Sequence, residues 1–249
     1  MLASNFSFNP KRFNLWPIYD TIKKYYPIGI SRDSEIYGEY EGMKELEEVL
    51  KEKNPKPRYY DNYWESFEQI VQQKIGFPLE STTDTQTPSF SAFLTIESFF
   101  PTVEERNVNQ MALTTELHFC VSLLGPFYTV YGVRKGVYLV KHRKRFQRQS
   151  LNANIVNIVY PCGEFETPFL ELNELILDQF DGYKFVPYSI FNMEIEGLQV
   201  HYGEGLSRKI YYALFNDSFN FHIPIVEEPG HYGFQDWIAD YPLDGGYWT

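Results

Sequence analysis

The spacing of the hydrophobic residues changes once along this chain, near Pro88, and that change limits the folds open to it. Before Pro88, apolar residues recur every three to four positions, which is the spacing of one helix face. From Phe90 onward they alternate with polar residues, as in a strand that buries one face. The stretch "MALTTELHFCVSL", residues 111–123, alternates most regularly. The chain therefore predicts a helical N-terminal part followed by a sheet.

Three helices are predicted before the change. The stretch "NLWPIYDTIKKYY" (14–26) has Asn14 as a candidate N-cap, "EGMKELEEVLKEK" (41–53) has one apolar stripe, and "DNYWESFEQIVQQKI" (61–75) has Asp61 as a candidate cap. A further helix, about 168–180, is predicted within "TPFLELNELILDQFDG", with Thr167 as its cap and Gly182 at its exit.

Strands are predicted on both sides of that later helix. Before it lie 90–99, 111–123, two strands within 127–140 that turn near Arg134 to Gly136, and 154–160; after it lie 183–187, 191–202, 208–215 and 219–226. We therefore predict an α+β fold in which N-terminal helices pack on a largely antiparallel β-sheet, with one helix (about 168–180) inserted between strand groups. We expect residues 1–249 to form a single domain, helical over about 1–80 and sheet-rich over about 88–249.

Positive charge is concentrated in the middle of an acidic chain. The formal net charge is −11, yet no Asp or Glu occurs from Leu117 to Gly163, and the rest of the chain carries −18. The acid-free interval contains seven cations: Arg134, Lys135, Lys141, Arg143, Lys144, Arg145 and Arg148. We expect "KHRKRFQRQ" (141–149) to project beyond the packed sheet or to follow an exposed edge. It would meet an acidic surface, on the chain's own C-terminal tail or on a partner.

Several classes of protein are disfavoured by the sequence. The first residues lack the pattern of a secretory signal, no apolar run reaches membrane-spanning length, and Cys120 and Cys162 are the only cysteines, so we predict a cytoplasmic protein with no membrane contact. The five histidines match no metal-binding spacing, and no nucleotide-binding motif occurs, so we predict no metal and no cofactor. Nucleic acid is not an expected partner because the negative field repels polyanions.

An acid–base site is one alternative. Glu116, His118 and Cys120 share one face of the predicted strand 111–123, and Glu97 would join them if 90–99 is its antiparallel neighbour. A carboxylate beside a histidine suits general acid–base catalysis. The favoured interpretation is that this face is simply the solvated side of the sheet, because alternation by itself produces the same pattern.

The acidic, aromatic C-terminal stretch is the candidate partner-binding surface. Its carboxylates would attract a basic protein and its aromatic rings would anchor it. The candidate residues are Asp236, Asp240, Asp244, Tyr247 and Trp248. Trp237 and Ile238, in contrast, are expected to pack back onto the sheet.

The leading functional prediction is a cytoplasmic protein-binding module, most concretely an immunity-type antagonist of a basic toxin or nuclease. The first alternative is an enzyme built on Glu97, Glu116 and His118, although the missing catalytic motifs disfavour catalysis. The second alternative is a structural or assembly subunit. The sequence specifies neither an oligomeric state nor a definite role for Lys141 to Arg148.

Overall fold

The computed structural model describes residues 13–53, 62–99, 110–142, 145–202, 208–228 and 232–239. Its helices are α1 (Trp16–Tyr25), α2 (Glu41–Lys53), α3 (Asn62–Ile75), α4 (Glu166–Gln179), α5 (Tyr188–Phe191) and α6 (Ile210–Leu214), with short 3₁₀ turns η1 (Gly163–Phe165) and η2 (Phe234–Trp237). Its strands are β1 (Leu79–Ser81), β2 (Ser89–Phe99), β3 (Gln110–Ser122), β4 (Phe127–His142), β5 (Arg145–Ile158), β6 (Lys184–Phe185) and β7 (Ile225–Val226).

The strands form one sheet, and the chain has the predicted α+β fold. The strand order is β1-β2-β3-β4-β5-β7, with β6 paired to β4. Strands β1 to β5 are antiparallel neighbours, whereas the short β6 and β7 add in parallel to β4 and β5. The change from helices to strands falls where the hydrophobic spacing changes, and α4 lies between β5 and β6, as predicted.

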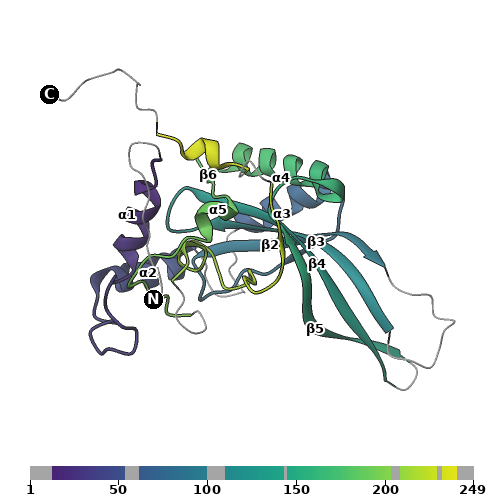
Figure 1. Cartoon of the computed structure of the whole chain (residues 1–249), viewed down its shortest axis with the longest axis horizontal. Helices are drawn as coiled ribbons and strands as arrows, with labels where there is room; N and C mark the ends of the chain where they lie inside the picture. The colour runs from purple at the N-terminus through teal and green to yellow at the C-terminus, as the bar shows by residue number, and fades with distance from the viewer. Residues whose placement is uncertain are drawn as a thin grey trace.

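Helix α3 packs on the sheet through aromatic side chains, whereas α1 packs against α2 and α6. Trp64 of α3 is fully buried and stacks on Phe90 of β2, with ring centroids 4.9 Å apart. Helices α3 and α4 lie together along one side of the sheet (Figure 1). The predicted N-cap Asn14 is wrong, because α1 starts after Leu15 and the Asn14 backbone N–H instead donates to the Trp237 carbonyl at 2.8 Å. The candidate cap Asp61 lies outside the described residues.

Helix α4 begins earlier than its sequence suggests. The turn η1 runs directly into the helix, so the N-cap is Phe165 and the proposed cap Thr167 lies inside the first turn. The predicted exit is confirmed, because Gly182 has φ +75°, a left-handed conformation that suits glycine.

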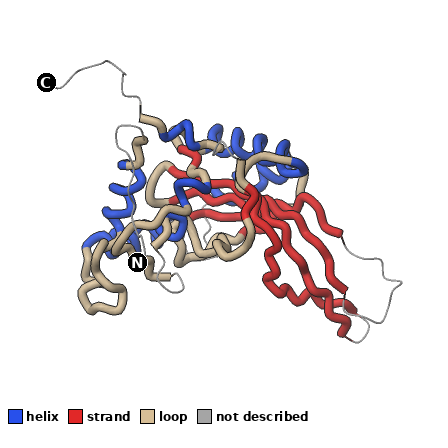
Figure 2. The backbone as a smooth tube through the Cα atoms, viewed as in Figure 1, coloured by secondary structure: helices blue, strands red, loops and turns tan. Residues whose placement is uncertain are grey.

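A single strand replaces the two strands predicted over 127–140. Strand β4 continues through Arg134 to Gly136, and its pairing with β5 is irregular at two places there. A β-bulge places an extra residue in one strand and bends it, but the strand continues in the same direction. The reversal comes instead within the basic segment, where Lys141 pairs with Phe146 and His142 with Arg145. Figure 2 shows these strands running on beyond the helices, so the basic segment projects as expected.

Two of the four strands predicted after α4 are wrong, whereas 183–187 and 219–226 contain the short strands β6 and β7. The stretch 208–215 forms α6, and within 191–202 the described pairing is one isolated bridge, between Glu194 and Lys209. Alternation fails as a guide here because Ile210, Tyr211, Ala213 and Leu214 are all buried, while the backbone forms a short helix. These residues cover the second face of the sheet.

Candidate functional site

The polar face of β3 is buried, which corrects the favoured interpretation of a solvated face. Glu116, Cys120 and Ser122 are each 1% exposed, although Leu117 and Phe119 on the opposite face are also buried. The cover over Cys120 includes Tyr211 of α6, whose hydroxyl lies 3.7 Å from the Cys120 Sγ atom. Strand β3 is therefore covered on both faces, and its polar residues need partners inside the protein.

Glu116 has two such partners. Its Oε2 atom lies 3.1 Å from Nε2 of His118 and 2.6 Å from Nζ of Lys135, a residue of β4. Burial disfavours the ionised carboxylate, but the hydrogen bonds from His118 and Lys135 outweigh that cost and lower the pKa of Glu116. The carboxylate is thus charged and compensated by Lys135.

His118 is enclosed between two aromatic rings. Its ring stacks on Phe93 at a centroid distance of 5.1 Å and on Tyr131 at 5.3 Å. Burial lowers the pKa of His118, and Glu116 offsets only part of that shift, so the imidazole is neutral at neutral pH. Because both ring faces are covered, a reacting group could approach the imidazole only at its edge.

Glu97 lies apart from this cluster, contrary to the prediction. Strands β2 and β3 are antiparallel neighbours, but the register shifts between Thr95, which pairs with Glu116, and Glu97, so Glu97 pairs with Thr115 instead of Thr114. Residues directly opposite each other point to the same face, and Thr115 is on the other face from Glu116. The bulge at Ile96 therefore separates Glu97 from Glu116 and His118, which remain in contact with each other.

A hydrogen-bonded network continues the polar face beyond His118. The Tyr211 hydroxyl donates to Oδ1 of Asn216 at 2.7 Å and lies 3.1 Å from the Tyr131 hydroxyl, and the Asn216 amide donates to Sγ of Cys120 at 3.3 Å. Burial raises the pKa of the Cys120 thiol to about 12. A thiol that stays protonated at neutral pH is a poor nucleophile, so this network stabilises packing.

Two carboxylates at the borders of the acid-free interval neutralise its first two cations. Glu116 pairs with Lys135, and Glu164 accepts a hydrogen bond from Nε of Arg134 at 2.8 Å. Arg134 and Lys135 are therefore part of the folded body rather than of a basic binding surface.

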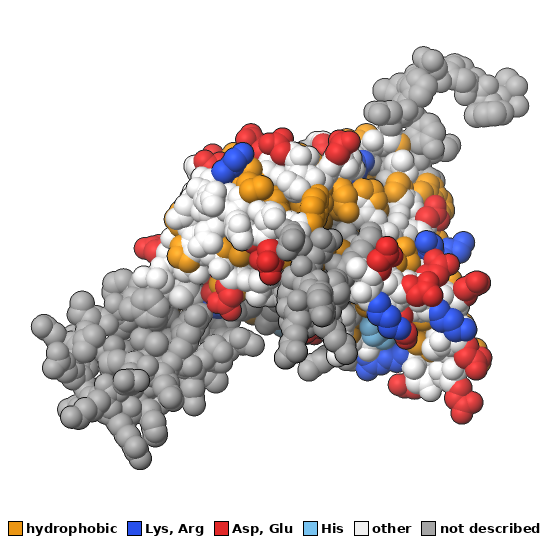
Figure 3. Space-filling model, turned by 180° about the vertical axis from the view of Figure 1, so that it is seen from behind, with side chains coloured by type: hydrophobic (Ala, Val, Ile, Leu, Met, Phe, Trp, Pro, Cys, Tyr) orange, Lys and Arg blue, Asp and Glu red, His pale blue; other side chains and the backbone are white. Residues whose placement is uncertain are grey.

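A second candidate site lies around α4 and the C-terminal turn η2. The helix contains no Lys or Arg, and its exposed surface combines carboxylates with two leucines, Leu170 at 43% and Leu177 at 45% exposure. Its exposed acidic residues are Glu166, Glu171, Glu174 and Asp178. Figure 3 shows acidic and apolar side chains together along the upper edge of the molecule, the level at which α4 lies in Figure 1.

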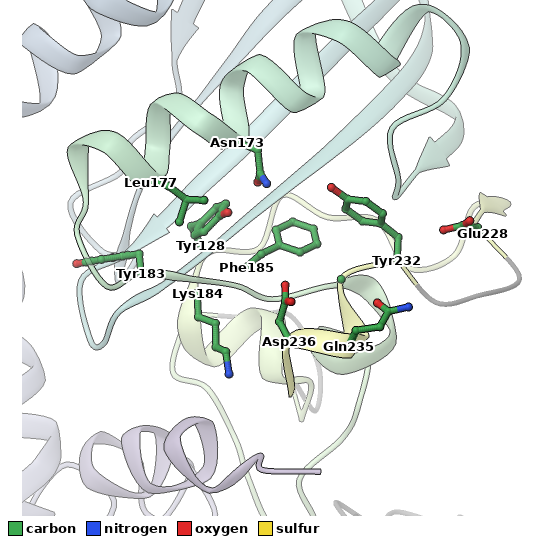
Figure 4. A pocket seen from close by; sticks show the side chains of 11 residues that line it. Tyr128, Asn173, Leu177, Tyr183, Lys184, Phe185, Glu228, Tyr232, Gln235 and Asp236 are labelled. Atoms are coloured by element: carbon green, nitrogen blue, oxygen red, sulfur yellow. The ribbon is translucent and has the colours of Figure 1, made fainter. Parts of the chain in front are cut away.

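A cavity of about 620 Å³ opens between α4, β6 and η2. Its walls include the rings of Tyr128, Phe185 and Tyr232, and its polar groups include Asn173 and Asp236. In Figure 4 the Asn173 amide and the Asp236 carboxylate lie on opposite sides of the Phe185 ring, whereas Lys184 points away. We call this the Asp236 cavity.

The Asp236 cavity is negatively charged. Burial, followed by the charges of neighbouring groups including Asp236, raises the pKa values of the Tyr128 and Tyr232 hydroxyls, which therefore stay protonated. No Lys or Arg among the described residues forms an ion pair with Asp236, and Nζ of Lys184 lies instead 4.4 Å from the Trp237 ring centroid. The Asn173 side chain hydrogen-bonds the Tyr128 hydroxyl, and its Oδ1 atom is buried.

The predicted partner-binding residues fall in two groups. Asp236 is exposed and borders the cavity, whereas Asp240, Asp244, Tyr247 and Trp248 lie outside the described residues. Trp237 packs inward as expected, because it is fully buried and its indole N–H donates to the Phe185 carbonyl at 2.8 Å. Ile238 is 48% exposed, which contradicts its expected packing.

Sequence reasoning missed the contribution of α4 to this surface. The signal was available, because "ELNELILD" carries carboxylates on the same helix face as leucines, but the leucines read as core residues. The contribution of Tyr128 and Asn173 had no local signal, since β4 and α4 are brought together only by the fold.

Within the described residues, no group of three His, Cys, Asp or Glu side chains is arranged to hold a metal ion. None of the helices in the described part of the chain is long and apolar enough to span a membrane. Comparison of the chain with protein-family models, with curated proteins and with solved structures finds no match.

Proposed function

We propose that this protein is a binding module for a basic protein partner, which it contacts through the acidic surface formed by α4 and η2. The observation that carries the proposal is the combination of carboxylates that form no ion pair within the described residues with exposed leucines beside an open cavity. Carboxylates steer a basic partner and favour its orientation, and apolar side chains supply area that becomes buried on association. An immunity-type antagonist of a basic toxin or nuclease is the most specific form of this proposal.

The arrangement of the polar groups on β3 supports binding over catalysis as the function. The Glu116 carboxylate already has Lys135 and His118 as partners, and both faces of the His118 ring are covered. The cavity at Asp236, in contrast, offers acceptors and aromatic surface to an incoming group.

The test is a binding comparison with charge-matched variants. The full chain is immobilised and exposed to extract from its own cells, and retained proteins are identified by mass spectrometry and remeasured in purified form. One variant carries Glu171→Lys, Glu174→Lys and Asp178→Lys on α4, and the control carries Glu41→Lys, Glu48→Lys and Glu52→Lys on the exposed side of α2.

Both variants change the net charge equally, so only location distinguishes them. We expect a basic partner that the wild type and the α2 variant bind and the α4 variant does not, with an association rate that falls as salt is added. A partner that binds the α4 variant as tightly as the wild type would contradict the proposal.

A further inference from the structure

The Asp236 cavity is lined by groups that complement one kind of side chain. It offers the Asp236 carboxylate and the hydroxyls of Tyr128 and Tyr232, all of which can accept hydrogen bonds. A ligand that supplies several donors would pair with them.

The walls of the cavity favour a cation over a neutral donor. The Phe185 ring centroid lies 5.6 Å from those of both Tyr128 and Tyr232, so the three rings form a continuous aromatic wall. The electron-rich faces of such rings attract cations. Glu228 is also among the lining residues and adds negative charge at the rim.

We infer that the Asp236 cavity is a binding site for an arginine side chain of the partner. This inference rests on the proposed function, because it names the group that the acidic surface receives. A guanidinium is planar and carries five donors, so it can donate two hydrogen bonds to the Asp236 carboxylate while its plane stacks on an aromatic ring of the wall. An ammonium has three donors on a compact head and lacks the planar surface for stacking.

The cavity supplies its own reporter for a direct test. The Trp237 indole N–H donates to the Phe185 carbonyl, and Phe185 forms part of the wall, so a group that binds there changes the indole resonance of Trp237 in ¹H–¹⁵N spectra. The full chain is titrated with N-acetyl-arginine methylamide, with its lysine counterpart, and with its citrulline counterpart, which has nearly the same shape as arginine but no charge.

We expect saturable shifts of the Trp237 resonance with the arginine probe, and affinities at least about tenfold weaker for the citrulline and lysine probes. Asp236→Asn should weaken arginine binding by about the same factor. The control Asp181→Asn removes the same charge from the exposed turn after α4, outside the cavity, and should leave the affinity of the probe within about twofold of wild type.

Three outcomes would overturn the inference. The first is a Trp237 resonance that no probe shifts in a saturable manner. The second is an equal affinity for the citrulline probe, and the third is an equal affinity for the lysine probe. Spectra recorded without probe show whether Asp236→Asn is folded. Its backbone resonances should match those of the wild type outside the cavity.

The failure of this inference can be separated from the failure of the proposed function. The probe titration needs no partner, so it tests the cavity even if no basic protein is found. Conversely, a partner that loses binding to the α4 charge variant but binds Asp236→Asn as tightly as wild type would support the acidic surface and contradict the arginine site.

Discussion

Two carboxylates on this protein, Glu116 and Asp236, stand in opposite electrostatic situations. Glu116 is almost without exposure, and its Oε2 atom contacts Lys135 and His118. Asp236 faces a cavity lined by aromatic rings, and no cation of the described chain pairs with it. Both regions combine carboxylates with aromatic side chains, so composition by itself does not distinguish them.

The difference teaches where the negative charge of this protein can act on other molecules. A buried charge that has its counter-ion contributes to specifying the fold, and removing the counter-ion destabilises the protein. A charge without a counter-ion at an open cavity contributes little to the fold and remains available to a ligand. The following experiments test this contrast, from the largest expected effect to the smallest.

Replacing His118 with aspartate should produce the largest loss. His118→Asp places a second carboxylate beside Glu116 in a buried aromatic environment, so we expect the free energy of unfolding to fall by about 4 kcal/mol. Urea denaturation followed by circular dichroism measures it. A solvated face would tolerate this change but not Leu117→Asp on the buried side, whereas the structure predicts large effects for both. A wild-type urea midpoint for His118→Asp would mean that the polar face of β3 is solvated.

Removing Lys135, the counter-ion of Glu116, should lower the free energy of unfolding by slightly less. Lys135→Met leaves the Glu116 carboxylate buried with a neutral histidine, and we expect a loss of about 3 kcal/mol of unfolding free energy. The double variant Lys135→Met, Glu116→Gln removes both charges and should recover a measurable part of that loss. If the double variant is less stable than Lys135→Met, the unpaired charge of Glu116 is not the cause of the stability loss in Lys135→Met.

Acidification should destabilise the protein through the same cluster. The pKa of His118 is lowered in the folded state, so between its ordinary value of 6.5 and that lower value the unfolded chain binds a proton that the folded chain does not. Unfolding free energy should therefore fall as pH falls below about 7. Glu116, whose folded pKa lies below 4.5, adds a second decline in more acidic solution.

Urea midpoints measured between pH 8 and pH 5 give the slope due to histidine. The matched variant His118→Gln should show a shallower slope, because the contribution of His118 is removed. Some slope should remain, because His201, whose pKa is also lowered by burial, is retained. An unchanged slope in His118→Gln would assign the pH dependence to other groups.

Asp236→Asn should have the smallest effect on stability. The residue is exposed and has no described counter-ion, so we expect the free energy of unfolding to stay within about 0.5 kcal/mol of wild type. The same urea experiment measures it. A loss comparable to that of Lys135→Met would remove the contrast between the two regions.

The sequence predicted those parts of the fold that depend on local spacing. The change of period near Pro88 located the start of the sheet, and the stripe that contains Trp64 located α3, because one face of each element must be buried. Alternation failed for β3 in a specific way. It separated Glu116 from Leu117 correctly, but it could not show that residues about ninety positions later cover the polar face.

The candidate sites were less predictable, for related reasons. A single bulge at Ile96 moves Glu97 away from Glu116, and no residue in that stretch signals the bulge. Asp236 was identified from its charge, yet the cavity beside it depends on Tyr128, Asn173 and Phe185, which come from three separate elements. Strand pairing and helix placement bring such groups together, and local sequence patterns predict neither.

The cover over β3 also sets an order of events during synthesis. Cys120 and its partner Tyr211 are 91 residues apart, so on a ribosome that adds about 5 to 20 residues per second β3 emerges several seconds before its cover. During that interval, a strand with apolar residues on both faces would promote association with other nascent chains. Glu116, His118 and Ser122 can be hydrated until α6 has been synthesised, so the polar alternation of β3 lowers the risk of aggregation before folding is complete.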